Sequence, residues 1–306
     1  MMSHSWGQLF DSEFLAQLDR LAVASKRAVQ SSRTGVRASH RLGDGLEFAD
    51  HRDYAPGDNV RFVDWRYFAR MDRLLTRLFH EHREGGVAIL LDCSASMNGG
   101  DGEVQERSAF WVRALRMAAI LGYISVAGHE RVWLCGYTDT LHEPFRVATR
   151  REDMPGLLDA LAQMTPSGKA NLRSTIERYQ ALSNHPGAVI IISDLLDAGD
   201  EVDEGLAMLG LAGCDVSVLH ATDTTWAERL RGNAVEFVDA ETNDALSVTV
   251  TDAMVDRFRE HQDTQVDALR RAIQGRGANY VPAPLDEPLD ELVLLRLRQG
   301  GVLVSP

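Results

Sequence analysis

Three short segments built almost wholly from apolar residues constrain the fold more than any other feature of this chain. They are GVAILLD at residues 86–92, GAVIIISD at residues 187–194 and CDVSVLHA at residues 214–221. Apolar runs of this length without polar alternation are typical of strands buried on both faces. The intervening stretches have helical periodicity, over residues 103–127, 151–163, 172–183 and 200–212. This alternation predicts an α/β fold with a mostly parallel sheet and helices on both faces.

The segments on either side of this core predict further elements. Residues 12–30 predict an N-terminal helix, and residues 73–84 alternate well enough to predict a strand. Towards the C-terminus we expect a strand or hairpin over residues 234–250, then three elements: a long helix over 252–275, a short strand over 278–284 and a last helix over 289–299. We therefore expect two parts. Residues 1–85 form an N-terminal helix and a β extension packed on the sheet, and residues 86–306 form the α/β domain with a helical extension.

The charge of the chain is unevenly distributed. Residues 1–85 carry 13 Lys/Arg and 12 Asp/Glu, a net +1, and the remainder carries 19 and 33, a net −14, which together give the total of −13. An acidic surface repels phosphate backbones, so no nucleic-acid partner is expected. Such a surface suits a basic protein partner, but plain solubility is the favoured explanation.

The sequence also bears on cellular location. It holds no run of eighteen or more apolar residues, so no transmembrane segment is expected. Its N-terminus lacks the basic and apolar regions of a secretory signal. The three cysteines, Cys93, Cys135 and Cys214, are odd in number and lie in or beside apolar runs. Reduced thiols of this kind predict a cytoplasmic protein.

Polar residues follow two of the apolar strands at the point where each strand ends. Asp92 closes the first, Ser94 and Ser96 follow it, and Asp194 closes the second. In an open parallel sheet, ligands bind beyond the carboxyl ends of the strands. Hydroxyl and carboxylate oxygens suit Mg²⁺ or Mn²⁺. A serine or aspartate at a strand end can also simply cap a helix, but the second strand that ends in aspartate favours a ligand site.

Two sequence segments carry a family resemblance. LLDCSASM, at residues 90–97, resembles the metal-ion-dependent adhesion site of von Willebrand factor A domains. GDGLEFADHRDYAPGDNVRFVDWRYFAR, at residues 43–70, resembles the signature segment of the bacterial domain-of-unknown-function family fifty-eight, and the similarity extends over roughly residues 33–240. The resemblance implies a von Willebrand factor A-like, doubly wound fold. It also implies a non-enzymatic adaptor or co-chaperone that binds a MoxR-type AAA+ ATPase and other protein clients.

Carried over residue by residue, the resemblance implies a set of metal ligands. Ser94 and Ser96 would bind the ion directly, and Asp92 and Asp194 would act mostly through water. The family pattern adds a threonine from a GGTxL-like loop, but here that loop reads GKANL at residues 168–172. Ala170 therefore stands where the threonine hydroxyl is expected, and one direct ligand is missing. The candidates to replace it are Asn171, Ser174 and Thr175.

Two other functions remain as alternatives. The first is a scaffold whose degenerate site holds no metal, which the missing threonine favours. The second is a Mg²⁺-dependent phosphatase, because such enzymes also place an aspartate after an apolar strand. Their chemistry needs a second aspartate as general acid, where this chain has Ser94, and a serine cannot protonate a leaving group at neutral pH. Upstream, Asp64, Trp65 and their neighbours predict either a structural clasp or a docking face.

Overall fold

The computed structural model describes residues 9–21, 42–43, 47–54, 63–80, 86–98, 108–143, 145–182, 187–196, 199–223, 225–238 and 245–292. These residues fall into two compact units. The larger holds residues 9–21 and the described residues from 86 onwards, and the smaller holds those from 42 to 80. The N-terminal helix therefore belongs to the larger unit, whereas the expected boundary at residue 85 grouped it with the signature segment.

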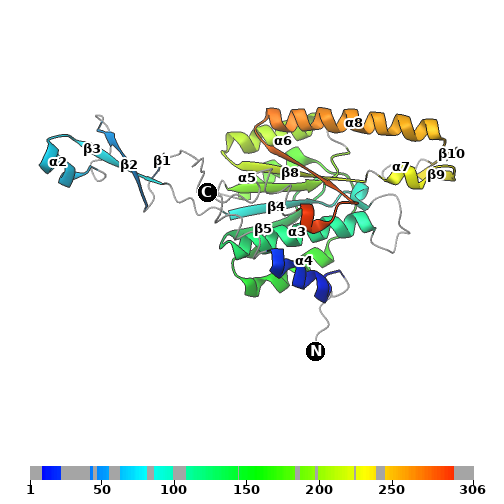
Figure 1. Cartoon of the computed structure of the whole chain (residues 1–306), viewed down its shortest axis with the longest axis horizontal. Coiled ribbons are helices and arrows are strands. Elements are labelled where there is room, and N and C mark those ends of the chain that lie inside the picture. The colour runs from blue at the N-terminus through cyan, green and yellow to red at the C-terminus, as the bar shows by residue number, and fades with distance from the viewer. Residues whose placement is uncertain are drawn as a thin grey trace. The chain divides into compact units, whose positions relative to one another are not determined.

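A six-stranded sheet forms the centre of the larger unit, with the strand order β11-β8-β7-β4-β5-β6 (Figure 1). Neighbouring strands run parallel except β5 and β6, which are antiparallel. The predicted mostly parallel sheet is thus confirmed. The strands are β4 (Gly86–Asp92), β5 (Arg131–Tyr137), β6 (Arg146–Ala148), β7 (Ala188–Ser193), β8 (Asp215–Thr222) and β11 (Asn279–Pro284).

Helices cover both faces of this sheet because its central strands are apolar on both sides (Figure 1). Along β4, Ile89 and Leu91 enter one core with α3 and α4, whereas Ala88 and Leu90 enter a second core with α5 and α6. This alternation is the ordinary side-chain geometry of a strand. The helices are α3 (Ala109–Ala127), α4 (Met154–Gln163), α5 (Leu172–Leu182), α6 (Asp200–Leu211) and α8 (Asp252–Gly275).

Several shorter elements complete the larger unit. The segment predicted as a strand or hairpin is a hairpin, with β9 (Ala234–Val238) paired antiparallel with β10 (Ala245–Thr249). The remaining elements are η3 (Ala95–Asn98), η4 (Arg151–Asp153), α7 (Trp226–Arg229) and α9 (Leu289–Glu291). The predicted last helix lies outside the described residues beyond residue 292.

The N-terminal helix, described over residues 12–21, packs on the core that contains α3. Asp11 caps it, because its Oδ1 accepts the backbone N–H of Phe14 at 2.7 Å. Phe14 and Leu18 are buried in the same cluster as Trp111 of α3. Within the described ranges, α3 alone is long and apolar enough to cross a membrane by length and composition, and 61% of its most apolar window is buried in this fold.

Over its described residues, the smaller unit consists of a three-stranded antiparallel sheet and one helix. Its strands are β1 (Leu42–Gly43), β2 (Glu47–Asp53) and β3 (Leu75–His80), in the order β1-β3-β2, and its helix is α2 (Trp65–Met71). Asp64 caps α2 by accepting the backbone N–H of Tyr67 at 3.0 Å. Trp65 is exposed and contacts Phe68 edge-on, with 6.3 Å between ring centroids.

Candidate metal-ion and partner-binding site

The candidate site lies where two neighbouring strands end. Asp92 is the last residue of β4, and Asp194 directly follows β7. Because β4 and β7 pair in parallel, both carboxylates reach the same edge of the sheet. Asp92, Asp194, Ser94 and Ser96 line one small pocket of about 30 Å³. The structure therefore brings together all four residues that the sequence singles out.

Asp92 is 2% exposed, and hydrogen bonds surround its carboxylate. Its Oδ1 accepts the backbone N–H of Ser94 at 2.8 Å, and its Oδ2 accepts the hydroxyl of Ser193 at 2.6 Å. Tyr137, opposite Asp92 on β5, donates its hydroxyl to the same Oδ2 over 3.4 Å. Burial, with the charge of Asp92, raises the pKa of Tyr137 well above its usual value. The phenol therefore stays protonated and able to donate.

The serines lie on a loop that its neighbours hold in place. The hydroxyl oxygens of Ser94 and Ser96 are 3.0 Å apart. Met97, fully buried, anchors the short helix η3 that follows Ser94. Backbone bonds tie this loop to the next one, since the N–H of Ala95 donates to the carbonyl of Gly168 at 2.9 Å. The serine hydroxyls and the loop that carries Ala170 are consequently held side by side.

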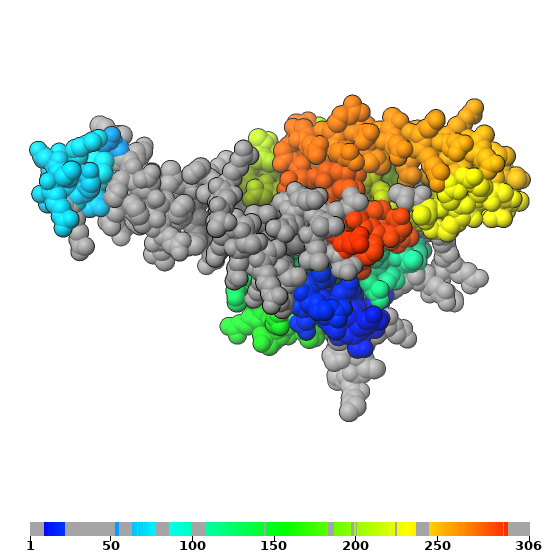
Figure 2. All heavy atoms as spheres, in the orientation of Figure 1, coloured from blue at the N-terminus to red at the C-terminus, as the bar shows by residue number. Residues whose placement is uncertain are grey.

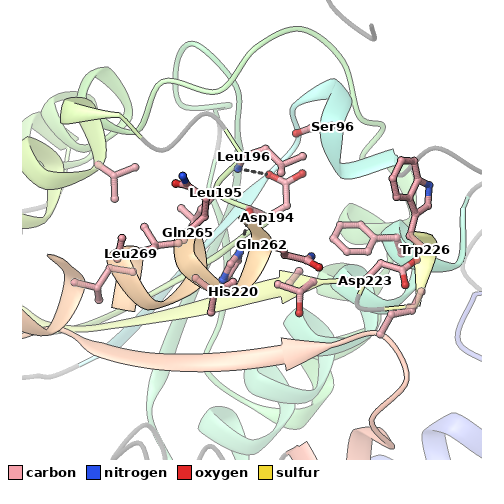
Figure 3. Close-up of a pocket in the computed structure, with 18 of the residues that line it drawn as sticks. Ser96, Asp194, Leu195, Leu196, His220, Asp223, Trp226, Gln262, Gln265 and Leu269 are labelled. Carbon is pink, nitrogen blue, oxygen red and sulfur yellow. Dashed lines mark hydrogen bonds between the residues drawn. The ribbon is translucent and has the colours of Figure 1, made fainter. Parts of the chain in front are cut away.

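A tight turn after β7 orients the side chain of Asp194 toward the pocket. The backbone N–H of Leu195 donates to Oγ of Ser193 at 3.0 Å. The N–H of Leu196 donates to Oδ1 of Asp194 at 3.2 Å (Figure 3). Leu195 adopts φ +51°, a left-handed conformation that is uncommon for a residue other than glycine. Such conformations cluster at functional sites, where the surrounding contacts hold them.

His220 of β8 supports the same turn from below. Its Nε2 lies 2.9 Å from the backbone carbonyl oxygen of Asp194 (Figure 3). Its Nδ1 lies 2.7 Å from the hydroxyl of Tyr280. A carbonyl can only accept, so Nε2 carries the proton and Nδ1 accepts from Tyr280. Burial lowers the pKa of His220 to about 4, which keeps the ring neutral. We assign His220 a positioning role for the backbone of Asp194.

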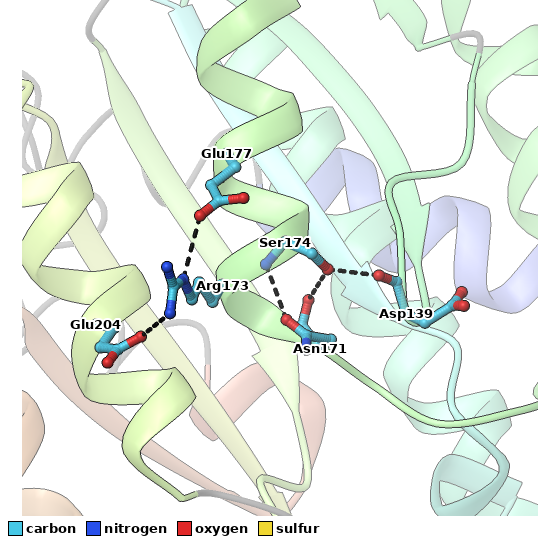
Figure 4. Close-up of polar contacts among 6 residues, drawn as sticks. All are labelled: Asp139, Asn171, Arg173, Ser174, Glu177 and Glu204. Atoms are coloured by element: carbon cyan, nitrogen blue, oxygen red, sulfur yellow. Dashed lines mark hydrogen bonds and ion pairs between the residues drawn. The ribbon is translucent and has the colours of Figure 1, made fainter.

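Ala170 lines the pocket, but the three side chains proposed to replace the missing threonine hydroxyl do not point into it. Asn171 caps α5, since its Oδ1 accepts the backbone N–H of Ser174 at 2.8 Å (Figure 4). The hydroxyl of Ser174 donates to the backbone carbonyl of Asp139, and that of Thr175 donates to the carbonyl of Asn171 at 2.8 Å. Asn171, Ser174 and Thr175 do not line the pocket. In this arrangement the missing hydroxyl is not replaced.

Three pocket residues were not predicted from the sequence. Ser193 and Tyr137 bond to Asp92, and Glu201 of α6 adds a carboxylate to the pocket wall. Tyr137 could have been found, because it ends the strand next to β4 in the predicted sheet. The sequence gives no comparable signal for Glu201, which depends on how the turn after Asp194 enters α6.

The donor atoms fit a small hard cation in part. Neighbouring ligand oxygens in an octahedron of 2.0–2.1 Å bonds lie about 2.8–3.0 Å apart, and the Ser94 and Ser96 hydroxyls have that spacing. Among the described residues, no three His, Cys, Asp or Glu side chains form a group that could hold a metal. A fitting ion is therefore one that keeps water ligands, with the two hydroxyls as its direct protein ligands and the carboxylates as partners of those waters.

Comparisons with known proteins give a family but no activity. The family described as "Protein of unknown function DUF58" matches residues 50–270. The uncharacterised protein Rv1480 of Mycobacterium tuberculosis is 24% identical over 304 residues, which span 98% of this chain and 94% of that protein. Among solved structures, the conserved hypothetical protein BatB from Bacteroides thetaiotaomicron matches 71% of this chain and 99% of its own, with 16% identity and a TM-score of 0.44. The von Willebrand factor domain of the pilus tip protein Mfa5 from Porphyromonas gingivalis matches 36% and 37%, with 17% identity and a TM-score of 0.29.

Proposed function

This chain belongs to the DUF58 family, and we propose that it is a non-enzymatic, cytoplasmic protein-binding module with a von Willebrand factor A-like fold. The partner docks at the carboxyl edge of the sheet, where a hydrated Mg²⁺ or Mn²⁺ ion is held. Ser94 and Ser96 bind the ion directly, and Asp92 and Asp194 orient its waters. The ion supplies a positive centre that an acidic side chain of the partner completes.

One observation carries this proposal: residues from two separate strands converge on a single pocket of about 30 Å³. One water needs roughly 10–15 Å³ of such space, so the pocket suits an ion with a water or a single carboxylate group. A phosphatase of the kind considered above needs a second aspartate as general acid, where this chain has Ser94. The residues of the pocket therefore favour binding over phosphatase chemistry.

We propose a MoxR-type AAA+ ATPase as the partner, on the strength of the family resemblance. The test is binding of the purified full-length chain to such an ATPase from the same organism, in Mg²⁺ and then in EDTA. Binding should depend on the ion and should fall at least about tenfold for Ser94→Ala. Ser247→Ala, which alters an exposed serine of β10, is the matched control and should bind normally. Binding that is insensitive to both EDTA and Ser94→Ala would remove the ion from the proposal.

A second candidate is favoured by the loop at residues 168–172. Because Ala170 contributes no oxygen and its neighbours cap α5, the site lacks one direct ligand of the family pattern. A metal-free scaffold would use the same edge through hydrogen bonds alone. Calorimetric titration with Mg²⁺ separates the two functions: heat that disappears in Ser94→Ala supports the ion, and its absence in the unaltered protein supports the scaffold.

A further inference from the structure

A large groove lies beside the small pocket, along helix α8. It has a volume of about 1360 Å³, and the two hollows share Ser96, Asp194, Leu195, Leu196 and Val202 (Figure 3). We call it the α8 groove. Leu206 and Ile273, both buried, lie at its base, and Trp226 packs against Phe258 at one end with 5.5 Å between ring centroids. A groove of this size exceeds the usual range of small-molecule pockets.

The groove exists because α8 leaves much of its apolar stripe uncovered. The apolar members of the stripe are Phe258, Val266, Leu269 and Ile273, and the polar Gln262 lies between the first two at the same helical spacing. Of the 24 residues in α8, only Val255 and Ile273 are buried. Figure 2 shows α8 along one border of the larger unit, in orange. A surface helix ordinarily buries such a stripe, so this one is available to another apolar surface.

The form of the groove indicates a helix as its occupant. From Phe258 to Ile273 the stripe spans 16 residues, and the 15 steps of 1.5 Å between them give about 22 Å, or four turns of a bound helix. Binding of an extended partner peptide as an added strand is disfavoured at the adjacent edge of the sheet. β11 forms that edge, and Pro282 and Pro284 lack the N–H groups that pairing requires.

The charge of the groove indicates which residues the bound helix carries on its flanks. Among the described residues that line it are Asp194, Asp203 and Asp223, with no lysine or arginine. Arg276 and Arg229 do not line the groove, but their ion pairs with Asp203 and Asp223 offset part of this negative charge. The sequence from residue 86 onwards carries a net −14, so the wider field also attracts a basic partner. Fatty acids and phosphorylated ligands, which are anionic, do not match this lining.

We propose that the α8 groove binds an amphipathic helix of a partner protein, apolar on one face and carrying lysine or arginine on its flanks. This goes beyond the proposed function, because the groove needs no metal ion. The aromatic pair Trp226 and Phe258 forms one anchor, since aromatic residues dominate binding energy at interfaces. Leu196, which is 74% exposed at the rim shared with the small pocket, continues the apolar surface.

The test uses two labelled 15-residue probe peptides and the full-length chain. Both have leucine at helical spacing; one carries lysine at the remaining positions, and the other carries glutamate. Fluorescence anisotropy should show that the lysine peptide binds at least about tenfold more tightly than the glutamate peptide. Measured in EDTA, binding should be unchanged in Ser94→Ala, because Ser94 does not line the groove, and this separates the result from any failure of the ion-dependent site.

Two variants in the groove and one control outside it show whether the lysine peptide binds in the α8 groove. Phe258→Ser removes an apolar anchor, and Ala268→Trp fills the groove from an exposed position without emptying the core. Each should weaken binding of the lysine peptide at least about tenfold, with unchanged circular dichroism. Leu211→Ser alters a leucine that is 90% exposed outside the groove and should have no effect. Equal binding by all four proteins would show only non-specific attraction and would overturn the proposal, as would equal binding of the two peptides.

Discussion

Ser193 donates its hydroxyl to Oδ2 of Asp92 at 2.6 Å, and this bond joins the ends of strands β7 and β4. The hydroxyl oxygen of Ser193 in turn accepts the backbone N–H of Leu195, which belongs to the turn that positions Asp194. One buried hydroxyl thus connects both carboxylates of the candidate site. The relative position of the two carboxylates is thus tied to the pairing of β4 and β7.

Ser193→Ala should therefore destabilise the fold. The change leaves Oδ2 of Asp92 with the long bond from Tyr137 alone and takes away the acceptor of the Leu195 N–H. A buried polar group that loses its partner costs about 1–3 kcal/mol. Urea denaturation should show a loss of that size, whereas Ser247→Ala, at an exposed site, should stay within about 0.5 kcal/mol. Equal midpoints for the two variants would contradict the role assigned to Ser193.

Ala170→Thr should strengthen Mg²⁺ binding. Ala170 lines the pocket at the position of the family threonine, so the change adds an oxygen ligand beside Ser94 and Ser96. A gain of about 1.4 kcal/mol, or tenfold in affinity, is expected in calorimetric titration. Ala170→Val is the matched control, since it adds nearly the same volume without a hydroxyl and should give no gain. Similar affinities for the two variants would show that volume, not the oxygen, matters at this position.

Stability should fall in mild acid because of His220. Its pKa is about 4 in the fold, below the ordinary value of about 6.5, so the unfolded chain binds more protons between these values. Stability is then fully present above about pH 6.5 and is lost as the pH falls towards 4. At 1.36 kcal/mol per unit, the loss reaches roughly 3 kcal/mol. Denaturation series from pH 4 to 7 should show this slope, and His220→Gln should flatten it. An unaltered slope in that variant would assign the acid sensitivity to other groups.

The core of the fold can be predicted from the sequence because the apolar runs that form its strands are strong, local signals. Apolar runs bounded by polar residues predicted β4, β7 and β8, and a parallel sheet then requires Asp92 and Asp194 to lie at the same edge. That β4 and β7 are neighbours depends on topology, which the sequence suggested only through the family resemblance.

Other features depend on choices that a sequence pattern leaves open. Asn171 can cap a helix or bind a cation with the same side chain, and only the start of α5 at Leu172 decides for the cap. The apolar face of the N-terminal helix predicts burial but not the surface that buries it, which proves to be the core beside α3. The apolar stripe of α8 likewise gives no sign that much of it stays uncovered.

Gly187→Ala should be costly, because Gly187 lies against the start of β4. A methyl group there would collide with the backbone carbonyl oxygen of Gly86, which cannot move without disturbing the sheet. Overpacking of this kind costs about 1–3 kcal/mol. Gly156→Ala is the control, since Gly156 lies in α4 with open space around it and should gain roughly 0.5–1 kcal/mol. Thermal or urea denaturation should therefore shift in opposite directions for these two identical substitutions.

The thiols Cys93 and Cys135 should resist alkylation while the protein is folded. Both are buried, and burial raises the pKa of each to about 12. At pH 8 only about one such thiol in ten thousand is ionised, and the thiolate is the reactive form. Iodoacetamide should first modify Cys214, which is only half-buried, and should reach the other two after urea unfolding. Peptide mass spectrometry measures the three rates, and native labelling of Cys93 as fast as Cys214 would show that β4 does not lie in a closed core.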